Sequence, residues 1–302
     1  MRGFFSACIA VCLGNLGHAQ ELDISEIVAA QTAYDESQTE TRRTALLRAL
    51  SNYQDDATVE TVNAHLIVMS NDVASGDYEK MRESAVAATA HLAPVAEFLP
   101  QQYIEAKFVG AISLFNSEED ASAMLEMAHV EGFTGRFREP GFDDRPVWAI
   151  NIYWKATAWT MAMDAYFETA KKDHPSEDEI NAVLANYKVD TETLNAAAKA
   201  SEAESALPFC DGRVVQSPQL RYPARSMRKG MVGAVIMGMD FDTGGKVLNP
   251  KVLASIPSDE FDESLLRTVS KWRYRAKKRK DVGVTCRVDR TNIVIPFIFT
   301  LE

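Results

Sequence analysis

The chain has 302 residues, of which 46% are hydrophobic and 25% are charged, and its formal net charge is −11. This composition agrees with a soluble globular protein, and no segment reaches the roughly 18 consecutive apolar residues that a membrane-spanning helix requires. The length favours two domains over a single core.

The first residues have the pattern of a secretory signal. Arg2 precedes a short apolar run from Phe4 to Leu13, and Gly17-His18-Ala19 offers the small residues that a signal peptidase recognises. We therefore predict a signal peptide over residues 1–19, cleaved after Ala19. The alternative is an uncleaved anchor, although the apolar run would cross only about half of a bilayer.

Residues 20–200 are predicted to form an all-α domain of helical hairpins. Apolar residues recur at helical spacing, as in Leu46, Leu47 and Leu50, and the alternation typical of strands is missing. Glycine and proline residues divide the region into pieces of helix length, at Gly76, Pro94, Pro100, 132–141, Pro146 and Pro175.

Part of this region resembles a tetratricopeptide repeat. Residues 62–94 form a unit of about 34 residues in which Gly76-Asp77 separates two helices. Looser units follow at 98–131 and 148–187. Such an array would present a concave surface to protein partners, and the alternative is an ordinary helical bundle. One set of aromatic residues lies near helical spacing and is interpreted as core: Trp148, Tyr153, Trp154, Trp159 and Tyr166.

The charge of the chain is divided unevenly. Residues 208–302 carry 17 Lys and Arg against 10 Asp and Glu, whereas residues 1–207 carry 15 against 33. The opposite signs favour contact between the two parts, or a basic C-terminal face for anionic partners. We place a linker at residues 201–207, where the last predicted helix ends.

The part from 208 to 302 is predicted to begin its sheet with a hairpin. Val232 to Phe241 alternates like a strand, Asp242-Thr243-Gly244-Gly245 supplies the turn, and Lys246 to Ser255 forms the second strand.

A helix and a last strand complete this predicted domain. The helix begins at Ser258-Asp259-Glu260, and its apolar face should cover the sheet through Phe261, Leu265, Val269 and Trp272. The last strand runs from Arg290 to Leu301. Pro296 lacks a ladder donor, which places that strand at a sheet edge.

The order of residues in this part resembles the C-terminal domain of the TonB family. The resemblance is carried by Tyr222-Pro223-Ala224-Arg225, Gly230, Gly233, Val235, Phe241, Gly245, Val247, Phe261, Trp272-Arg273-Tyr274 and Ile295-Pro296-Phe297-Ile298-Phe299. The predicted fold class is therefore α+β overall: an all-α helical-hairpin domain, then a small TonB-like antiparallel sheet covered by one helix. In the family, this module lies in the periplasm and contacts outer-membrane transporters.

The resemblance implies two partner-binding segments. In the family, an extended partner segment adds to the last strand. The resemblance therefore implies the same partner-binding role for Thr291, Asn292, Ile293, Val294, Ile295, Phe297 and Phe299. The family also uses the segment before its Tyr-Pro pair, here Gln216, Ser217, Pro218 and Gln219 with Tyr222 and Pro223. The alternative for both is a structural role, with the edge covered by the N-terminal domain or by a second copy of the chain.

The chain departs from the family pattern after Trp272-Arg273-Tyr274. Ala276 stands where the family has a proline, and a basic loop follows at Lys277, Lys278, Arg279 and Lys280. The loop is interpreted as solvated, with contact to anionic glycan, lipid headgroups or the acidic domain as the alternative. The family's inner-membrane anchor and Pro-rich spacer are not predicted, so energy transduction by this chain alone is not expected.

Two cysteines, Cys210 and Cys286, remain after the predicted cleavage. In an oxidising compartment we predict a disulfide between them, with two buried free thiols as the alternative.

No catalytic or metal site is predicted. The histidines His65, His91, His129 and His174 have no zinc-type spacing, and the sequence contains no nucleophile elbow, phosphate loop or dinucleotide fingerprint. We expect a protein that is not an enzyme and that uses no cofactor.

The main prediction is a periplasmic adapter whose C-terminal domain binds an extended partner segment by strand addition. One alternative is a component of TonB-dependent outer-membrane transport, energised through separate inner-membrane motor proteins. Another is a structural envelope protein that binds peptidoglycan through its basic loop. The expected partners are thus an outer-membrane receptor or a motor complex, peptidoglycan in the third case, and not nucleic acid; a dimer through the edge strand is a further alternative.

Overall fold

The computed structural model describes residues 23–53, 57–116, 120–138, 146–187, 212–216, 218–276 and 290–301. Two compact units are present, residues 1–126 and residues 127–302. The predicted signal peptide and the predicted linker, 201–207, lie outside the described residues. The domain boundary drawn from the sequence therefore stays a prediction.

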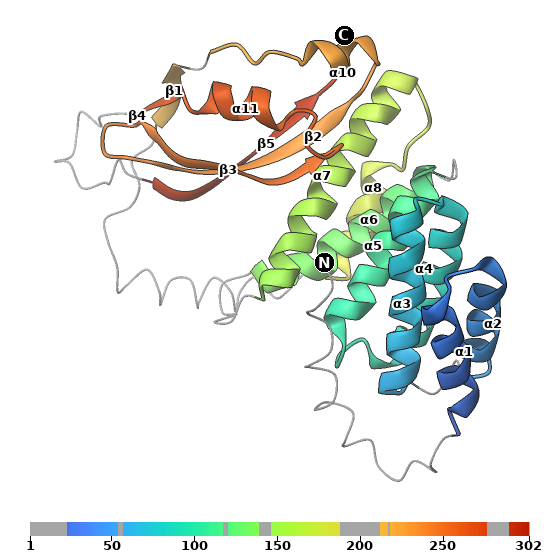
Figure 1. Ribbon diagram of the computed structural model, residues 1–302. Helices are drawn as coiled ribbons and strands as arrows, with labels where there is room; N and C mark the ends of the chain where they lie inside the picture. The colour runs from blue at the N-terminus through green and yellow to red at the C-terminus, as the bar shows by residue number, and fades with distance from the viewer. Residues whose placement is uncertain are drawn as a thin grey trace, which may run out of the picture. The chain divides into compact units, whose positions relative to one another are not determined.

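The first unit consists of helices that pack on their neighbours along the chain (Figure 1). They are α1 (Ser25–Glu36), α2 (Glu40–Ser51), α3 (Val59–Ser75), α4 (Tyr78–Leu92), α5 (Pro100–Asn116) and the beginning of α6 (Asp120–Gly135). The predicted helical N-terminal region is confirmed. Whether its hairpins form a tetratricopeptide repeat stays a prediction.

The turn between α3 and α4 shows how the sequence ends one helix and begins the next. Gly76 adopts a φ of 72°, in the left-handed region that favours glycine at a helix end. The Asp77 carboxylate then accepts a hydrogen bond from the backbone N–H of Lys80 at 3.2 Å and caps α4. This tight connection places α3 and α4 side by side.

The second unit contains the rest of α6, the long helix α7 (Val147–Ala170) and α8 (Glu177–Ala185). The buried residues of α7 are mostly alanines, with three larger side chains among them: Ala149, Ile152, Ala156, Ala158, Ala162, Met163, Ala165 and Phe167. The aromatic residues that the sequence analysis assigned to the core, including Trp148, Trp154 and Trp159, are half-buried. They border the buried face because alanines allow closer packing along its centre.

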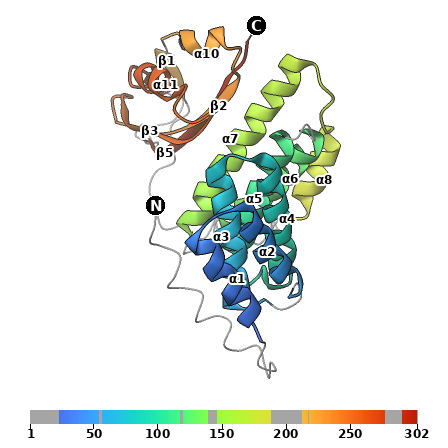
Figure 2. The same cartoon turned by 45° about the vertical axis from the view of Figure 1, so that its right-hand side comes forward.

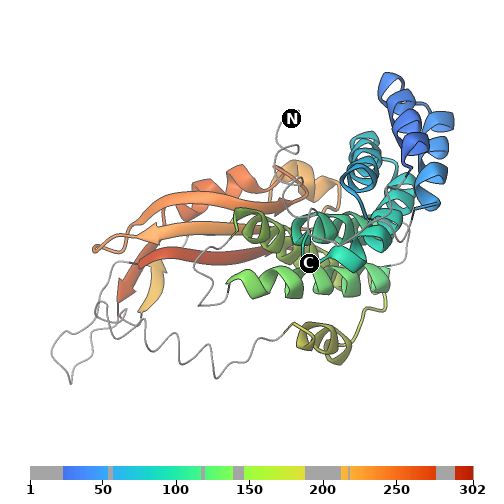
Figure 3. The ribbon, with the colours of Figure 1, turned by 90° about the horizontal axis from the view of Figure 1, so that it is seen from below.

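The same unit contains two small antiparallel sheets. The larger has the strand order β3-β2-β5, formed by β3 (Val247–Ile256), β2 (Gly233–Phe241) and β5 (Arg290–Phe299). The smaller pairs β1 (Gly212–Gln216) with β4 (Arg273–Ala276). Figure 3 shows the three longer strands side by side, with the dark red β5 at one edge.

The two faces of the larger sheet are covered by different helices. Helix α11 (Asp262–Val269) packs on one face, which we call the first face, through Leu265 and Val269. Helix α7 packs on the opposite, second face, where Ala158 meets Ile236 and Ala254. The two helices lie on opposite sides of the sheet in Figure 2.

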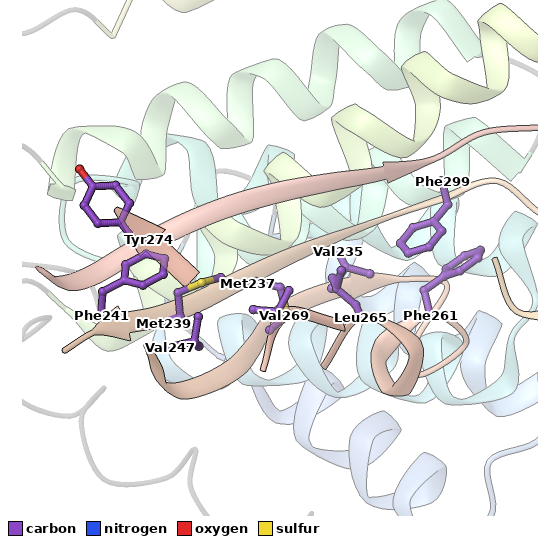
Figure 4. Packing of buried hydrophobic residues seen from close by; sticks show 10 residues of the cluster. All are labelled: Val235, Met237, Met239, Phe241, Val247, Phe261, Leu265, Val269, Tyr274 and Phe299. Carbon is purple, nitrogen blue, oxygen red and sulfur yellow. The ribbon is translucent and has the colours of Figure 1, made fainter. Parts of the chain in front are cut away.

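The core of the first face is a continuous apolar cluster (Figure 4). Alternate residues of β2 point into it, together with residues of β3, α11 and its N-cap, β4 and β5: Val235, Met237, Met239, Phe241, Val247, Phe261, Leu265, Val269, Tyr274 and Phe299. Alternation sends the intervening Ile236 to the second face, where it is fully buried. A strand that is buried on both faces belongs at the centre of a sheet, and β2 lies there.

The predicted fold class is confirmed: a helical N-terminal region precedes a small antiparallel sheet. One boundary was wrong, because α11 begins at Asp262, and residues 258–260 form a turn in which Asp259 has a φ of 65°. The buried Phe261 at the N-cap fixes the start of the helix one turn later than expected. The sequence analysis also did not predict β1, β4 or the short helix α10 (Ala224–Arg228).

Candidate functional site

The candidate site is the outer edge of β5. This strand pairs with β2 on one side, and no other described strand pairs with it. Its register with β2 is unbroken from Ile293, opposite Met239, to Phe299, opposite Gly233. It shifts beyond Met239, and Thr291 and Asn292 fall in that irregular part. Of the predicted partner-binding residues, those from Ile293 onward therefore form the regular edge.

The direction of the backbone groups along this edge follows from the neighbouring hairpin. The N–H of Asp242 donates to the carbonyl of Lys246 at 2.9 Å. Because backbone groups alternate along a strand, the N–H and C=O groups of even-numbered residues of β2 point toward β3, and those of odd-numbered residues point toward β5. Odd-numbered residues of β5 therefore bond to β2. The backbone groups of Val294, Pro296 and Ile298 point to the open edge.

The side chains of β5 are divided between the two faces of the sheet. Ile293, Ile295 and Phe297 are half-buried against the first-face cluster, and Phe297 lies 5.5 Å from Trp272 between ring centroids. Val294 contacts the cluster that α7 forms on the second face. Ile298 is 44% exposed, and Pro296 is exposed as well.

Phe299 differs from the other predicted partner-binding residues because its side chain is part of the core. It is 2% exposed and stacks on Phe261, with ring centroids 4.2 Å apart and an angle of 19° between the planes (Figure 4). Its backbone, like that of the other odd-numbered residues of β5, faces β2, so Phe299 supports the strand and does not face the open edge. The main contribution of β5 to recognition is thus its backbone, together with the side chains of Pro296 and Ile298.

Part of the segment before Tyr222-Pro223 already pairs with another strand of the same chain. Gln216 ends β1 and pairs with Arg273 of β4, while Ser217 lies outside the described residues. Pro218 and Gln219 follow in irregular structure. This segment is therefore tied to the domain by β1, and its predicted contact with a partner stays a prediction.

Tyr222 and Pro223 have structural roles in this domain. The Tyr222 hydroxyl donates to the carbonyl of Met231, and its ring meets Phe261 and Phe299 edge-on, with centroids 5.5 Å and 5.7 Å away. Burial raises the pKa of the Tyr222 phenol. Pro223 is the N-cap of α10. Together they hold the chain against the residues that support the end of β5.

The opposite edge of the sheet, formed by β3, is less suited to pairing. The register between β2 and β3 shifts twice, which indicates bulges in β3. Asn249 has a φ of 48°, and Pro250 follows it within the strand. Bulges are a common device for blocking a strand edge, and the paired stretch of β5 from Ile293 to Phe299 has none. The regular outer edge of β5 is therefore the better candidate for strand addition.

The remaining predicted sites lie outside the described residues. These are the cysteines Cys210 and Cys286 and the basic loop Lys277, Lys278, Arg279 and Lys280. Among the residues that are described, no group of three or more His, Cys, Asp or Glu side chains could hold a metal ion. The Asp242 carboxylate accepts hydrogen bonds from the N–H groups of Gly244 and Lys246, at 2.9 Å and 2.7 Å, and so stabilises the turn.

The sequence analysis missed the contribution of α7 to this site. Trp154, Ala158 and Met161 recur on one side of the helix and pack behind the sheet, where Val294 of β5 joins the same cluster. The residues Ala149, Ile152, Ala156, Met163 and Phe167 recur at helical spacing on the other side and are buried too. The two apolar stripes on this helix could have indicated that it packs on two neighbours, because a helix that packs on one neighbour needs only one stripe.

A sheet of this order, with one helix on its first face and the last strand at its edge, defines a small α+β domain. Residues 218–301 match the family model of the Gram-negative bacterial TonB protein C-terminal. The predicted resemblance is thus confirmed for this domain, and the helical region precedes the matched residues.

Curated relatives and a solved structure show similarity over part of the chain. Protein TonB of Yersinia enterocolitica is 34% identical over 64 residues, covering 21% of this chain and 25% of the relative. Protein TonB of Salmonella typhimurium strain LT2 is 32% identical over 66 residues, covering 22% and 27%. The solution NMR structure of the Pseudomonas aeruginosa TonB CTD covers 32% of this chain and 94% of that chain, with 24% identity and a TM-score of 0.27.

The chain spans about a quarter of the length of the curated relatives it matches. The similarity therefore concerns the C-terminal domain, and the helical part of the chain must be considered by itself. In the part of the chain that the structure describes, the helices are too short or too polar to span a membrane.

Proposed function

We propose that the protein is a periplasmic adapter whose TonB-like domain binds an extended segment of a partner protein by strand addition to β5. The partner segment would complete the hydrogen bonds of the open edge, and its side chains would cover those of Pro296 and Ile298. The helical region would bind a second protein. The segment before Tyr222 would lie beside the first partner.

One observation carries this proposal: the TonB-like domain ends in a regular edge strand whose outer backbone groups have no described partner strand. Unpaired edge strands are sites where another extended segment can add. The bulged edge of β3 does not offer this geometry, and the second face is already occupied by α7.

A second candidate function is participation in TonB-dependent outer-membrane transport. It is favoured by the family match and by two relatives named Protein TonB. In that case, the partner segment would belong to an outer-membrane transporter, and separate inner-membrane proteins would supply the energy. The two candidates share the β5 edge and differ in the identity of the partner.

Strand addition can be tested at Val294. Its N–H points to the open edge, so Val294→Pro removes an outer donor without removing a bond to β2. The matched control is Val294→Ala, which shortens the same side chain and keeps the N–H. A photo-reactive amino acid in place of Thr300, which is exposed just beyond β5, would report on the partner in intact cell envelopes.

We expect crosslinking to persist in Val294→Ala and to fall in Val294→Pro while the thermal unfolding of the helical region is unchanged. A crosslinked periplasmic segment of an outer-membrane transporter, identified by mass spectrometry, would support the transport candidate. Another envelope protein crosslinked through an extended segment would support the adapter. Equal crosslinking in both variants would exclude strand addition at β5.

The compartment and the predicted processing need their own measurement. Cell fractionation should place the protein in the periplasm, and N-terminal sequencing of the purified protein should begin at Gln20 if Ala19 is the cleavage site. Recovery of the intact N-terminus in the membrane fraction would contradict the predicted cleavage.

A further inference from the structure

Pro296 stands at the middle of the open edge of β5. It lies opposite Ile236, between the outward-facing residues Val294 and Ile298. The open edge therefore presents three outward carbonyls, those of Val294, Pro296 and Ile298, but only two outward N–H groups, because proline has none.

This pattern affects pairing between two copies of the chain more than pairing with a different protein. If two β5 strands pair antiparallel about Pro296, Val294 of one lies opposite Ile298 of the other, and the two prolines face each other. Two of the six edge hydrogen bonds in that arrangement are then missing. When a foreign segment without proline pairs with β5 in the same way, only one of the six hydrogen bonds is missing.

The surroundings of Pro296 show that packing in the core does not explain its presence. Its side chain is exposed, whereas the neighbouring Val294 is half-buried in the cluster of α7. Ile236, opposite Pro296 on β2, is fully buried beneath that helix. The proline thus adds little to the second-face core, and its clearest physical effect is the missing N–H at the edge.

We propose that Pro296 makes the β5 edge selective for an extended segment of a different protein over β5 of a second copy. A prolyl residue at an outer edge position is a known way to prevent edge-to-edge association. The exposed side chains of Pro296 and Ile298 remain available to apolar side chains of the foreign segment. We therefore expect the partner segment to have an apolar residue at every second position, with these side chains on the second face of the extended sheet.

This inference rests on the proposed function of the edge, but its test requires no partner. Pro296→Val restores the outer N–H in the full-length protein with a residue that favours strands, and Pro296→Ala restores it with a smaller side chain. Thr300→Val is the matched control, because it adds an exposed apolar residue near the same end of β5 without adding an N–H. Sedimentation velocity and amide hydrogen exchange are measured for each.

The wild-type protein and Thr300→Val should sediment as monomers, with fast exchange at the amides of Val294 and Ile298 and slow exchange at Ile295 and Phe297. Pro296→Val should shift to a dimer in which the amides of Val294 and Ile298 become protected. Adding Val294→Pro to Pro296→Val should return the protein to a monomer. Pro296→Ala should show the same shift at higher protein concentration.

Three results would overturn the proposal. One is a monomeric Pro296→Val together with a monomeric Pro296→Ala at all concentrations tested. Another is a dimer whose Val294 and Ile298 amides exchange as fast as in the monomer, because that dimer would use another surface. The third is a wild-type protein that already dimerises with these two amides protected. None of these results would by itself exclude strand addition by a foreign segment.

Discussion

At the scale of single residues, Arg43 shows how a charged side chain can organise the interior of the helical unit. It is 4% exposed and makes two bonds of 2.8 Å to the carboxylate of Asp72, from Nε and from one terminal nitrogen. A further bond of 2.6 Å reaches Glu83, and another of 3.1 Å reaches the carbonyl of Lys80. One side chain of α2 thereby fixes both α3 and α4.

The pKa of Arg43 reflects this arrangement. Burial by itself lowers the pKa of the guanidinium, but the hydrogen bonds and charges of Asp72 and Glu83 outweigh that effect and raise it overall. The residue is charged at any physiological pH. Asp72 is 3% exposed, and this guanidinium compensates its buried charge.

We expect Arg43→Met to lower the free energy of unfolding by about 3–5 kcal/mol, because it leaves the carboxylate of Asp72 buried without its ion pair. Arg267→Ala, which removes an exposed pair with Glu263 on α11, should cost less than about 1 kcal/mol. Urea denaturation at pH 7 measures both. Similar losses in the two variants would contradict the organising role of Arg43.

At the scale of elements, the hairpin of α3 and α4 contains a buried pair of histidines. His65 and His91 are 4% and 1% exposed, with ring centroids 4.7 Å apart. The Nε2 atom of His91 lies 2.8 Å from the hydroxyl of Thr61, whereas neither ring nitrogen of His65 has a hydrogen-bond partner among the described residues. Burial, and then the charge of His91, lower the pKa of His65 from 6.5 to about 3.

This shift predicts that acid destabilises the helical unit. The unfolded chain takes up a proton at His65 near pH 6.5, but the folded chain does so only near pH 3. The contribution of neutral His65 to the free energy of unfolding is therefore complete above pH 6.5. It falls by about 1.4 kcal/mol for each pH unit below that value, down to about pH 3. His65→Leu removes this dependence.

Urea denaturation at pH 7.5 and pH 5 should show that the wild-type protein loses about 2 kcal/mol more than His65→Leu between these pH values. The exposed His174 provides the control, since His174→Leu should retain the wild-type dependence. If His65→Leu and the wild-type protein lose the same free energy, His65 is not the group responsible.

The elements of the C-terminal domain were predictable where local sequence determines them. Alternation marked β2 and β5, and the Asp242-Thr243-Gly244-Gly245 turn forms as expected, with a φ of 77° at Gly245. Gly245 also allows a close approach, because a Cβ atom there would lie 1.8 Å from the carbonyl oxygen of Tyr274. The edge position of β5 followed from Pro296 alone. These features depend on residues that are near each other in the chain or on the chemistry of one residue.

The features that escaped prediction depend on contacts between distant segments. Strands β1 and β4 are short and pair with each other, with one further bridge from Arg273 of β4 to Lys246, so neither has an alternation long enough to be recognised. The cover of the second face comes from α7, which lies far before β2 in the sequence. An apolar helix such as α7 indicates burial on several sides, but its sequence does not say which segment occupies each side.

At the scale of the whole molecule, α7 packs on the sheet of the TonB-like domain through non-covalent contacts, although it lies far before that sheet in the sequence. Trp154, Ala158 and Met161 pack on β2, β3 and β5, and the compact unit that holds the sheet also holds α7. The boundary predicted from the sequence would separate them. A partner bound at β5 would therefore act on an edge strand that α7 supports through Val294.

This arrangement predicts that the two sides of the predicted linker stay together after the chain is cut. A specific protease site is inserted within residues 188–211 and its complete cleavage is verified by denaturing electrophoresis. The fragments should then co-elute in native gel filtration because α7 still covers the sheet. Ala158→Glu places a carboxylate in the buried interface, where a charge without a partner is strongly disfavoured, and should cause the fragments to separate. Lys155→Glu changes an exposed residue of the same helix and serves as the control. Separation of the wild-type fragments at micromolar concentration would show that the contact between α7 and the sheet is too weak to join the two parts, and β5 would then work independently of the helical region.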